Sequence, residues 1–235
     1  MNMSETPKKV SNVLSRMNMI NGHISSLLND CRSALDDMKA EIESVNEIIR
    51  NAEKSISPSQ QGTFTDPRDG RTYRTVKIGE QTWMAENLAF AYAGSKCYDN
   101  DLANEAKYGR LYDWETAKKA CPPGWHLPTN AEWDELMNFA GGKDVAGKKL
   151  KSKSGWNNND NGTDEYGFSA LPGGLGNSSG SFFTVGNYGY WWSATESNAS
   201  YAYFRSMGYS GAGVGRYSGD KSNLYSVRCV QDCQD

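Results

Sequence analysis

The residues suited to redox, metal or proton-transfer chemistry are few and scattered. The five cysteines are Cys31, Cys97, Cys121, Cys229 and Cys233. An odd number argues against a complete disulfide framework, and no Cys–Cys or Cys–His spacing suits zinc. The only histidines are His23 and His126. His126 lies among apolar residues in GWHLPT, and catalysis would require a partner acid or base at defined geometry, so we expect a structural histidine with a catalytic one as the alternative.

An Asn- and Asp-rich segment, residues 157–167 (NNNDNGTDEYG), resembles a calcium-binding loop in part. The positions that fit are Asn157, Asn159, Asn161 and Gly162. The closing Glu of such a loop is replaced by Phe168, so an ordinary Asn/Gly turn is the favoured interpretation. If calcium binds here, Asp160 and Asp164 are the best oxygen donors.

The segment Tyr201–Asp220 (YAYFRSMGYSGAGVGRYSGD) has a pattern that favours binding. Its alternation predicts two strands, with one face able to pack through Tyr203, Met207, Tyr209, Ala212 and Val214. The interleaved residues are mostly Gly and Ser, which contribute little to packing. Tyr and Phe offer rigid contact area and Ser and Gly offer adaptability, as in antibody loops, so these interleaved positions predict a ligand-binding surface.

A turn centred between Ser210 and Gly211 fixes the register of this hairpin. The pairs it predicts are Met207 with Val214, Phe204 with Tyr217, and Gly208 with Gly213. It also places Arg205 opposite Arg216, and like charges across a strand pair are unfavourable. Either an acidic group lies between the two arginines or this register is wrong.

Two regions of different composition must position these residues. Residues 1–60 contain no Trp, Tyr or Phe, and residues 55–63 (SISPSQQGT) are typical of a linker. We therefore expect a stalk over 1–60 and a globular domain over 61–235.

The net charge of -3 does not suggest a nucleic-acid partner. No apolar run is long enough for a membrane span, and MNMSETPKKV lacks the apolar core of an export signal.

The stalk carries a heptad pattern of apolar residues. Its positions are Val10, Val13, Met17, Ile20, Ile24 and Leu27, then Cys31, Leu35, Met38, Ile42, Val45, Ile49, Ala52 and Ile56. Four extra residues near Leu28 form a stutter. A seam this long predicts a self-associating coiled coil, with a single helix packed on its own domain as the alternative. Isoleucine at inner positions is compatible with dimers and trimers, and we favour a trimer.

The remainder predicts an α+β domain. Early strands lie in 65–88, with turns at Asp69–Gly70 and Gly79–Glu80. One helix within 113–123 is stopped by two prolines. A second, within 127–142, begins at a capping box of Thr129 and Glu132 and ends at Gly141–Gly142. Later strands are expected over 190–195, 202–209, 212–217 and 225–230.

Several long segments, in order, carry a family resemblance. They are KYGRLYDWETAKKACPPGWHLPTNAEWDEL, DEYGFSALPGG, YWWSATE and YSVRCVQD, spanning 107–232. They resemble the Fibrobacter succinogenes major paralogous domain, which implies a C-type lectin-like fold of the formylglycine-generating-enzyme branch and a ligand-binding module. The shared helix signature is matched by Gly124, Leu127, Pro128, Thr129, Glu132 and Trp133.

The resemblance also bears on the cysteines. Family members often carry a second cysteine where Glu105 stands here, near Cys97. The typical fold-closing bridge would join Cys121 to Cys229, although in a reducing compartment all five cysteines would be thiols. Formylglycine-generating enzymes use paired cysteines, and Cys229 and Cys233 are four apart. An enzyme of this type is an alternative function, but no matching pocket chemistry is recognisable in the sequence.

The hairpin pattern further resembles the variable proteins of diversity-generating retroelements. There, randomised adenines turn Asn codons into codons that never encode Lys, Glu, Gln, Met or Trp. None of the candidate variable positions holds one of these five residue types, whereas two interleaved positions do, as Met207 and Lys221. The alternative is an ordinary inherited loop. The candidates are Tyr201, Phe204, Ser206, Gly208, Ser210, Gly211, Gly213, Gly215, Tyr217, Ser218, Gly219, Asp220 and Leu224, with Ser197 less certain.

Together these patterns predict a non-enzymatic receptor-binding protein. We expect a homo-oligomer whose several sites bind a bacterial surface protein or glycan with avidity, on a phage tail fibre in the virion or in the cytoplasm. We assign no catalytic residue, cofactor or resident metal. A structural assembly module, in which the domain is a spacer, is a further alternative.

Overall fold

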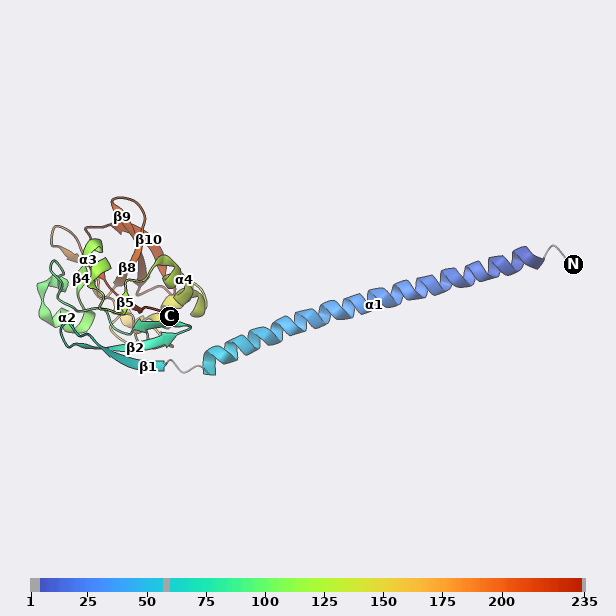
Figure 1. Cartoon of the computed structure of the whole chain (residues 1–235), viewed down its shortest axis with the longest axis horizontal. Helices are drawn as coiled ribbons and strands as arrows, with labels where there is room; N and C mark the ends of the chain where they lie inside the picture. The colour runs from blue at the N-terminus through green and yellow to red at the C-terminus, as the bar shows by residue number, and fades with distance from the viewer. Residues whose placement is uncertain (1–4, 57–59, 234–235) are drawn as a thin grey trace. The chain divides into compact units, whose positions relative to one another are not determined.

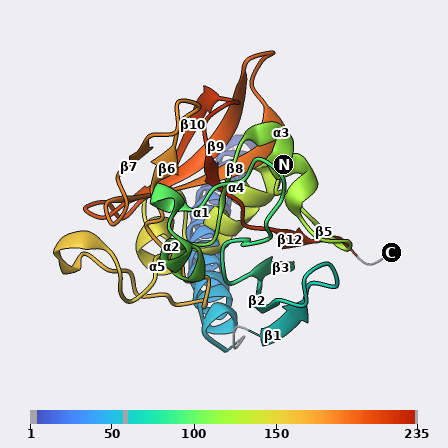
Figure 2. The same ribbon diagram turned by 90° about the vertical axis from the view of Figure 1, so that its left-hand side faces the viewer.

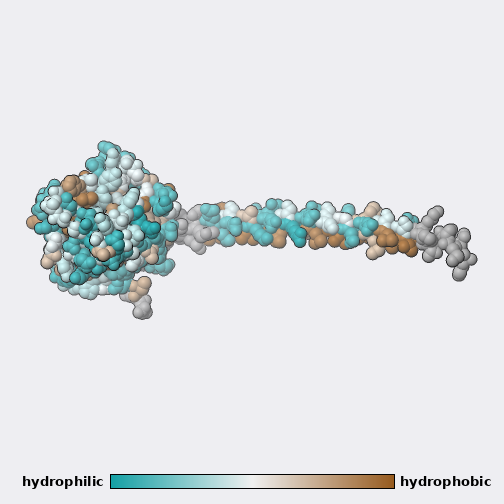
Figure 3. Space-filling view, turned by 90° about the horizontal axis from the view of Figure 1, so that it is seen from above, coloured by the Kyte–Doolittle hydropathy of each residue, from teal (hydrophilic) through white to brown (hydrophobic). Residues whose placement is uncertain are grey.

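A computed structural model describes residues 5–56 and 60–233, and the chain divides into two units, Met1–Pro58 and Ser59–Asp235. The first unit is the helix α1, Glu5–Ile56, as the heptad pattern predicts. The described side chains of α1, residues 10–49, are exposed throughout. Their apolar members gather along one face of the helix (Figure 3). Among the described residues, no helix is long and apolar enough to cross a membrane.

The second unit is an α+β domain with two five-stranded sheets, which occupy separate regions of the unit (Figures 1 and 2). The first sheet has the order β1-β2-β3-β12-β5, formed by Gln60–Thr65, Thr72–Ile78, Gln81–Met84, Val230–Gln231 and Trp125–His126. The second has the order β10-β9-β8-β11-β4, formed by Gly215–Asp220, Tyr201–Gly208, Tyr188–Glu196, Tyr225–Ser226 and Leu111–Tyr112. A small hairpin joins β6, Leu175–Gly176, to β7, Phe182–Phe183.

The predicted helices form because their ends are well capped. In α4, Asn130–Phe139, both halves of the capping box are present, and Gly141 and Gly142 follow with positive φ. In α3, Trp114–Ala120, the Asp113 side chain accepts a hydrogen bond from the Thr116 N–H. Two short helices were not predicted: α2, Leu102–Tyr108, and α5, Ala146–Leu150. Short 3-10 turns lie at Tyr98–Asn100 and Asn157–Asn159.

Two strand predictions need correction. The strand expected over 212–217 begins at Gly215, because the residues before it pair with other elements: the Val214 N–H donates to the Lys143 carbonyl, and the Ala212 carbonyl accepts from the Lys148 N–H. The strand expected over 225–230 divides into β11 and β12, which belong to different sheets. The C-terminal segment therefore joins the two sheets, and β12 lies between β3 and β5.

Tryptophan dominates the two main clusters of the core. Trp83, Trp133 and Trp191 centre one cluster, and Trp192 lies in the other with Tyr112 and Tyr225. The Cys121–Cys229 disulfide, with Cα atoms 6.0 Å apart, ties the residue after α3 to the segment before β12. Because Trp191 and Trp192 are adjacent in β8 and side chains alternate along a strand, the two clusters hold the second sheet from opposite faces.

Candidate functional site

The hairpin β9–β10 has the register predicted from its turn. Phe204 pairs with Tyr217 and Arg205 with Arg216, while Gly208 and Met207 lie beyond the end of the ladder with β10. Strand β8 extends the sheet on the other side, where Tyr188 pairs with Gly208 and Tyr190 with Ser206. The expected pairs of Met207 with Val214 and Gly208 with Gly213 do not form part of this ladder.

An acidic group lies between the two arginines, as this register requires. Asp134 of α4 accepts from Arg205 Nη2 at 2.8 Å and lies 3.3 Å from Arg216 Nη1. Arg205 is fully buried and also donates to the side chain and carbonyl of Asn130. Burial lowers the pKa of Arg205, and the Asp134 carboxylate opposes that effect. Asp134 therefore allows two like charges to face each other across the strands.

The predicted alternation is correct for one face of the hairpin. Because side chains alternate along a strand, the register puts six candidate positions on the same face: Phe204, Ser206 and Gly208 of β9, and Gly215, Tyr217 and Gly219 of β10. The opposite face carries Arg205 and Met207 toward α4 and the core. Tyr201, Ser218 and Asp220 belong to that opposite face, so the candidate set does not form one surface.

Four candidate positions are buried, which corrects the expectation that all of them belong to a ligand-binding surface. Phe204 and Leu224 are each 8% exposed, Ser206 is 8% exposed, and Gly219 is buried. The ring of Phe204 packs against those of Trp192 and Tyr225, at centroid distances of 6.3 and 4.8 Å. Leu224 belongs to a separate small cluster. Phe204 and Leu224 are thus packed against aromatic residues from distant parts of the chain.

The remaining candidates are accessible. Gly208, Gly213 and Gly215 are partly buried, and the exposed candidates are Ser197, Tyr201, Ser210, Gly211, Tyr217, Ser218 and Asp220. Asp220 accepts from both the N–H and the hydroxyl of Ser222, which makes it a turn-forming residue.

A groove of about 590 Å³ brings most of the candidates together. Those lining it are Phe204, Ser206, Gly208, Ser210, Gly211, Gly213, Gly215 and Tyr217. Its other side is formed by residues that the sequence analysis missed, among them Tyr188, Tyr190, Lys143 and Asp144. The alternating tyrosines of YGYWW were a usable signal for the first two. The groove is therefore lined by aromatic side chains, from Tyr188, Tyr190, Phe204 and Tyr217, and by glycines of β9, β10 and the loop between them.

The loop between β9 and β10, residues 209–214, is held by main-chain hydrogen bonds. The buried Lys151 ammonium donates to the carbonyls of Gly208, Tyr209 and Gly211, at 3.1, 2.8 and 3.0 Å, and to that of Asp160 at 3.2 Å. Burial lowers the pKa of Lys151. The bonds of Ala212 and Val214 to residues near α5 complete the attachment. These bonds all involve main-chain groups of the loop, so they do not depend on which residue stands at positions 210, 211 and 213.

The Asn- and Asp-rich segment has the contacts of a turn. Both carboxylate oxygens of Asp164 accept hydrogen bonds from Ser169, and the side-chain oxygen of Asn161 accepts from the Trp156 N–H. The Lys151 ammonium lies against the Asp160 carbonyl, where a calcium ion would be repelled. In the described part of the chain, no three His, Cys, Asp or Glu residues form a group that could hold a metal ion.

His126 has both ring nitrogens occupied. Nε2 lies 2.6 Å from Glu132 Oε1, and Nδ1 lies 2.5 Å from Asp232 Oδ1. The hydrogen bond with Glu132, supported by Asp232, raises the pKa of His126 to about 8. Although burial raises the pKa of Glu132, its bonds with His126 and Thr129 lower that pKa to about 2. This pairing joins β5 and the start of α4 to the C-terminal segment, which is the arrangement of a structural histidine.

The cysteines do not form the pair that a cysteine enzyme would use. Cys229 is bonded to Cys121, and Cys233 is an exposed free thiol. At the position where a second cysteine was expected, the Glu105 carboxylate accepts from the Cys97 thiol at 3.2 Å and pairs with Arg110. Burial raises the pKa of the Cys97 thiol.

These features define an α+β domain with an open groove, preceded by a long helix. The model of the Fibrobacter succinogenes major domain matches residues 76–231. The chain therefore belongs to the Fibrobacter succinogenes major domain family, as its sequence segments predict. Comparison with curated proteins and with solved structures gave no match.

Proposed function

We propose that the globular domain is a non-enzymatic ligand-recognition module and that the groove over β8, β9 and β10 is its binding site. The observation that carries this proposal is that the β9–β10 loop, residues 209–214, both lines the groove and is held through its main chain. Most predicted variable positions line the groove, while fixed residues hold the loop by its main chain. Side chains can then change while the loop keeps its shape, which is what a surface that recognises different ligands requires.

In this proposal the domain has a C-type lectin-like fold, and a retroelement diversifies part of the groove. The space around each glycine indicates which positions tolerate side chains. A Cβ at Gly211 would meet no atom within 4 Å, whereas one at Gly219 would lie 2.8 Å from Tyr225 Oη and 3.1 Å from Phe204 Cε1. We therefore place the variation at exposed groove positions such as Ser210, Gly211 and Tyr217, and we leave Phe204, Gly219 and Leu224 out of it.

The helix α1 supplies multivalency in this proposal. Its exposed apolar face includes Ile20, Ile24 and Ile42, and an isolated helix gains little stability from propensity alone. A parallel trimeric coiled coil would cover that face and present three grooves, which gives avidity to individually weak contacts. The setting we propose is a phage tail fibre whose ligand is a bacterial surface protein. No contact of the described cysteines favours the enzyme alternative.

Binding and genetics together test the proposal. We expect the DNA near the gene to hold a copy of the codons for residues about 190–232 that differs only at adenines. Exchanging Ser210, Gly211 and Tyr217 together for residues found in sister copies should change the ligand bound and leave the unfolding midpoint within the range of surface substitutions. A ligand that binds all such variants equally would place the binding site elsewhere.

A further inference from the structure

Strand β10 is the outer strand of its sheet, with β9 as its one neighbour among the described strands. The N–H groups of Tyr188 and Ala194 bond outside the β8–β9 pair, to Thr184 and Pro128. Since main-chain groups alternate sides along a strand, the Trp191–Arg205 pair must be a hydrogen-bonded one. By the same alternation, the main-chain groups of Gly215, Tyr217 and Gly219 face β9, and those of Arg216 and Ser218 face away.

The outward main-chain groups are open to a partner. On this outer side, the Val214 N–H already bonds to the Lys143 carbonyl. Beyond that point, no backbone group within residues 5–56 and 60–233 hydrogen-bonds to the N–H or carbonyl of Arg216 or Ser218. An edge strand with such unpaired groups is a template for a further strand.

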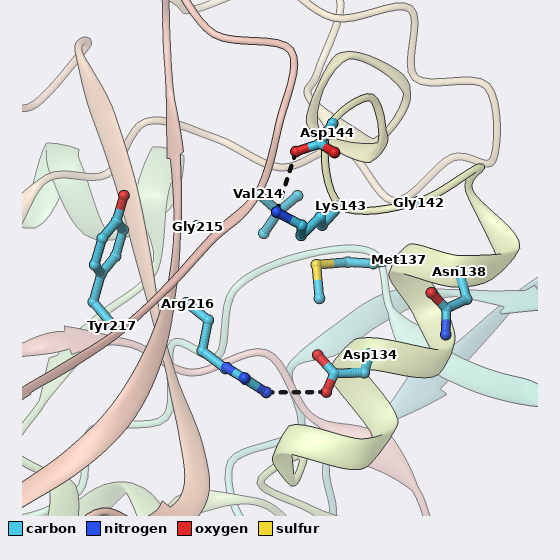
Figure 4. A pocket seen from close by; sticks show the side chains of 10 residues that line it. All are labelled: Asp134, Met137, Asn138, Gly142, Lys143, Asp144, Val214, Gly215, Arg216 and Tyr217. Atoms are coloured by element: carbon cyan, nitrogen blue, oxygen red, sulfur yellow. Dashed lines mark hydrogen bonds and ion pairs between the residues drawn. The ribbon is translucent and has the colours of Figure 1, made fainter.

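A groove of about 810 Å³ lies beside this edge, between β10 and α4 (Figure 4). Its lining includes Met137 and Asp134 of α4, Lys143, and Val214 and Arg216. Arg216 and Tyr217 leave β10 on opposite sides, with Arg216 directed toward Asp134 (Figure 4). A neighbouring strand lies about 4.7–4.9 Å from its partner, and the groove leaves the edge accessible for one.

The charges of the groove favour an acidic side chain in the partner. Two arginines share the single carboxylate of Asp134, and the shorter contact goes to Arg205, which is fully buried. Arg216 is about half exposed and only partly compensated. Lys143 and Asp144 pair with each other at 3.4 Å. A second copy of β10 would bring another Arg216 to this edge, and like charges on neighbouring strands are unfavourable.

We propose that the free edge of β10 binds an extended segment of a protein ligand by strand addition, with an acidic side chain of that segment against Arg216. This inference rests on the proposed function, because it names a protein as the ligand class. Main-chain hydrogen bonds give such binding a part that does not depend on side chains. The edge would then be a constant contact beside the variable groove.

The test uses the full chain and peptides selected on it from a phage-displayed random dodecapeptide library. We expect the selected peptides to carry Asp or Glu at one position and to slow amide exchange at Arg216 and Ser218. N-methylation along a selected peptide should reduce affinity about tenfold or more at every second residue, since each outward bond depends on one peptide N–H or carbonyl. Ser218→Pro should abolish binding, because it removes an outward donor at a position where an edge strand tolerates proline. Ser218→Ala is the control that keeps the donor.

Three results would overturn the inference: no peptide selected, no alternation in the N-methyl series, or unchanged exchange at Arg216 and Ser218. Edge-to-edge dimers of the chain that Ser218→Pro abolishes would also overturn it, because the occupant would then be a second copy. The binding groove and the β10 edge are separate proposals, and the experiments can reject one without the other. A ligand that depends on Ser210 and Tyr217 but is indifferent to Ser218→Pro would support the groove and reject the edge.

Discussion

The two ends of the β9–β10 hairpin are held in different ways. At its base, Phe204 packs against Trp192 and Tyr225, and a side chain at Gly219 would meet Phe204 and Tyr225. At its tip, the loop is fixed through its carbonyls by Lys151. The base thus depends on the identity of its side chains, and the tip depends on the identity of a lysine outside the hairpin. A fold can combine precise position with free choice of side chains in this way.

The largest effect should come from the base. Phe204→Ala should lower the free energy of unfolding by about 3–5 kcal/mol, because it removes a buried ring and leaves a cavity. Tyr217→Ala, its partner across the strands, should cost less than about 1 kcal/mol, because Tyr217 is 58% exposed. Urea unfolding monitored by circular dichroism measures both. Equal costs for the two variants would contradict the difference in burial between these two paired residues.

Lys151→Met should have the next largest effect. It removes a charged donor from four carbonyls. Hydrogen bonds to charged groups contribute about 1.5–3 kcal/mol each, but the net loss is smaller than their sum because water can hydrogen-bond to the carbonyls that lose the lysine. We expect a net loss of about 2–3 kcal/mol and faster amide exchange in residues 209–214. Lys148→Met is the control, since the Lys148 side chain contacts Asn161 and not the loop. Unchanged exchange in the loop would show that the main-chain bonds of Ala212 and Val214 are sufficient to hold it without Lys151.

Two glycines offer a finer comparison. Gly219→Ala should cost about 1–3 kcal/mol, because its methyl group would crowd Phe204 and Tyr225. Gly211→Ala has open space and should change stability by no more than about 0.5 kcal/mol. Thermal unfolding of the two variants measures the difference. A costly Gly211→Ala would contradict the proposal that the tip tolerates varied side chains.

The smallest effect concerns pH and is confined to His126, away from the hairpin. The folded pKa of His126, about 8, is above its ordinary value of 6.5. Its contribution to stability is therefore complete below pH 6.5 and is lost as the pH rises through 8. Solvent screening at this half-exposed site keeps the effect small. His126→Gln should remove the pH dependence of the unfolding midpoint in this window, while ligand binding at the groove stays constant across it.

Local signals in the sequence were sufficient for several parts of the fold. The capping box of Thr129 and Glu132 defines α4 because both its bonds lie within one turn, and the turn at Ser210–Gly211 sets the register of β9 and β10. The charge conflict between Arg205 and Arg216 left two alternatives, an acidic neighbour or a wrong register, and the structure has the first of them in Asp134.

The parts that could not be predicted depend on distant residues. Alternation placed Phe204 on the face with the groove, but its burial depends on Tyr225 and Trp192. The start of β10 depends on the Lys143 carbonyl, and the shape of the loop depends on Lys151. Neither lysine has a local pattern that distinguishes it from an exposed one. The candidate site was therefore found by its composition, and its limits were set by packing.

The place of β12 in the first sheet has a consequence for how the protein is made. This strand lies between β3 and β5 although it comes last in the chain, so the sheet cannot close until the ribosome has passed the whole hairpin. Domains with such non-local pairing fold late and slowly. A stop codon or frameshift anywhere in the hairpin would remove β12, the strand that links β3 to β5. An intact reading frame through the hairpin is therefore required before the first sheet can be completed.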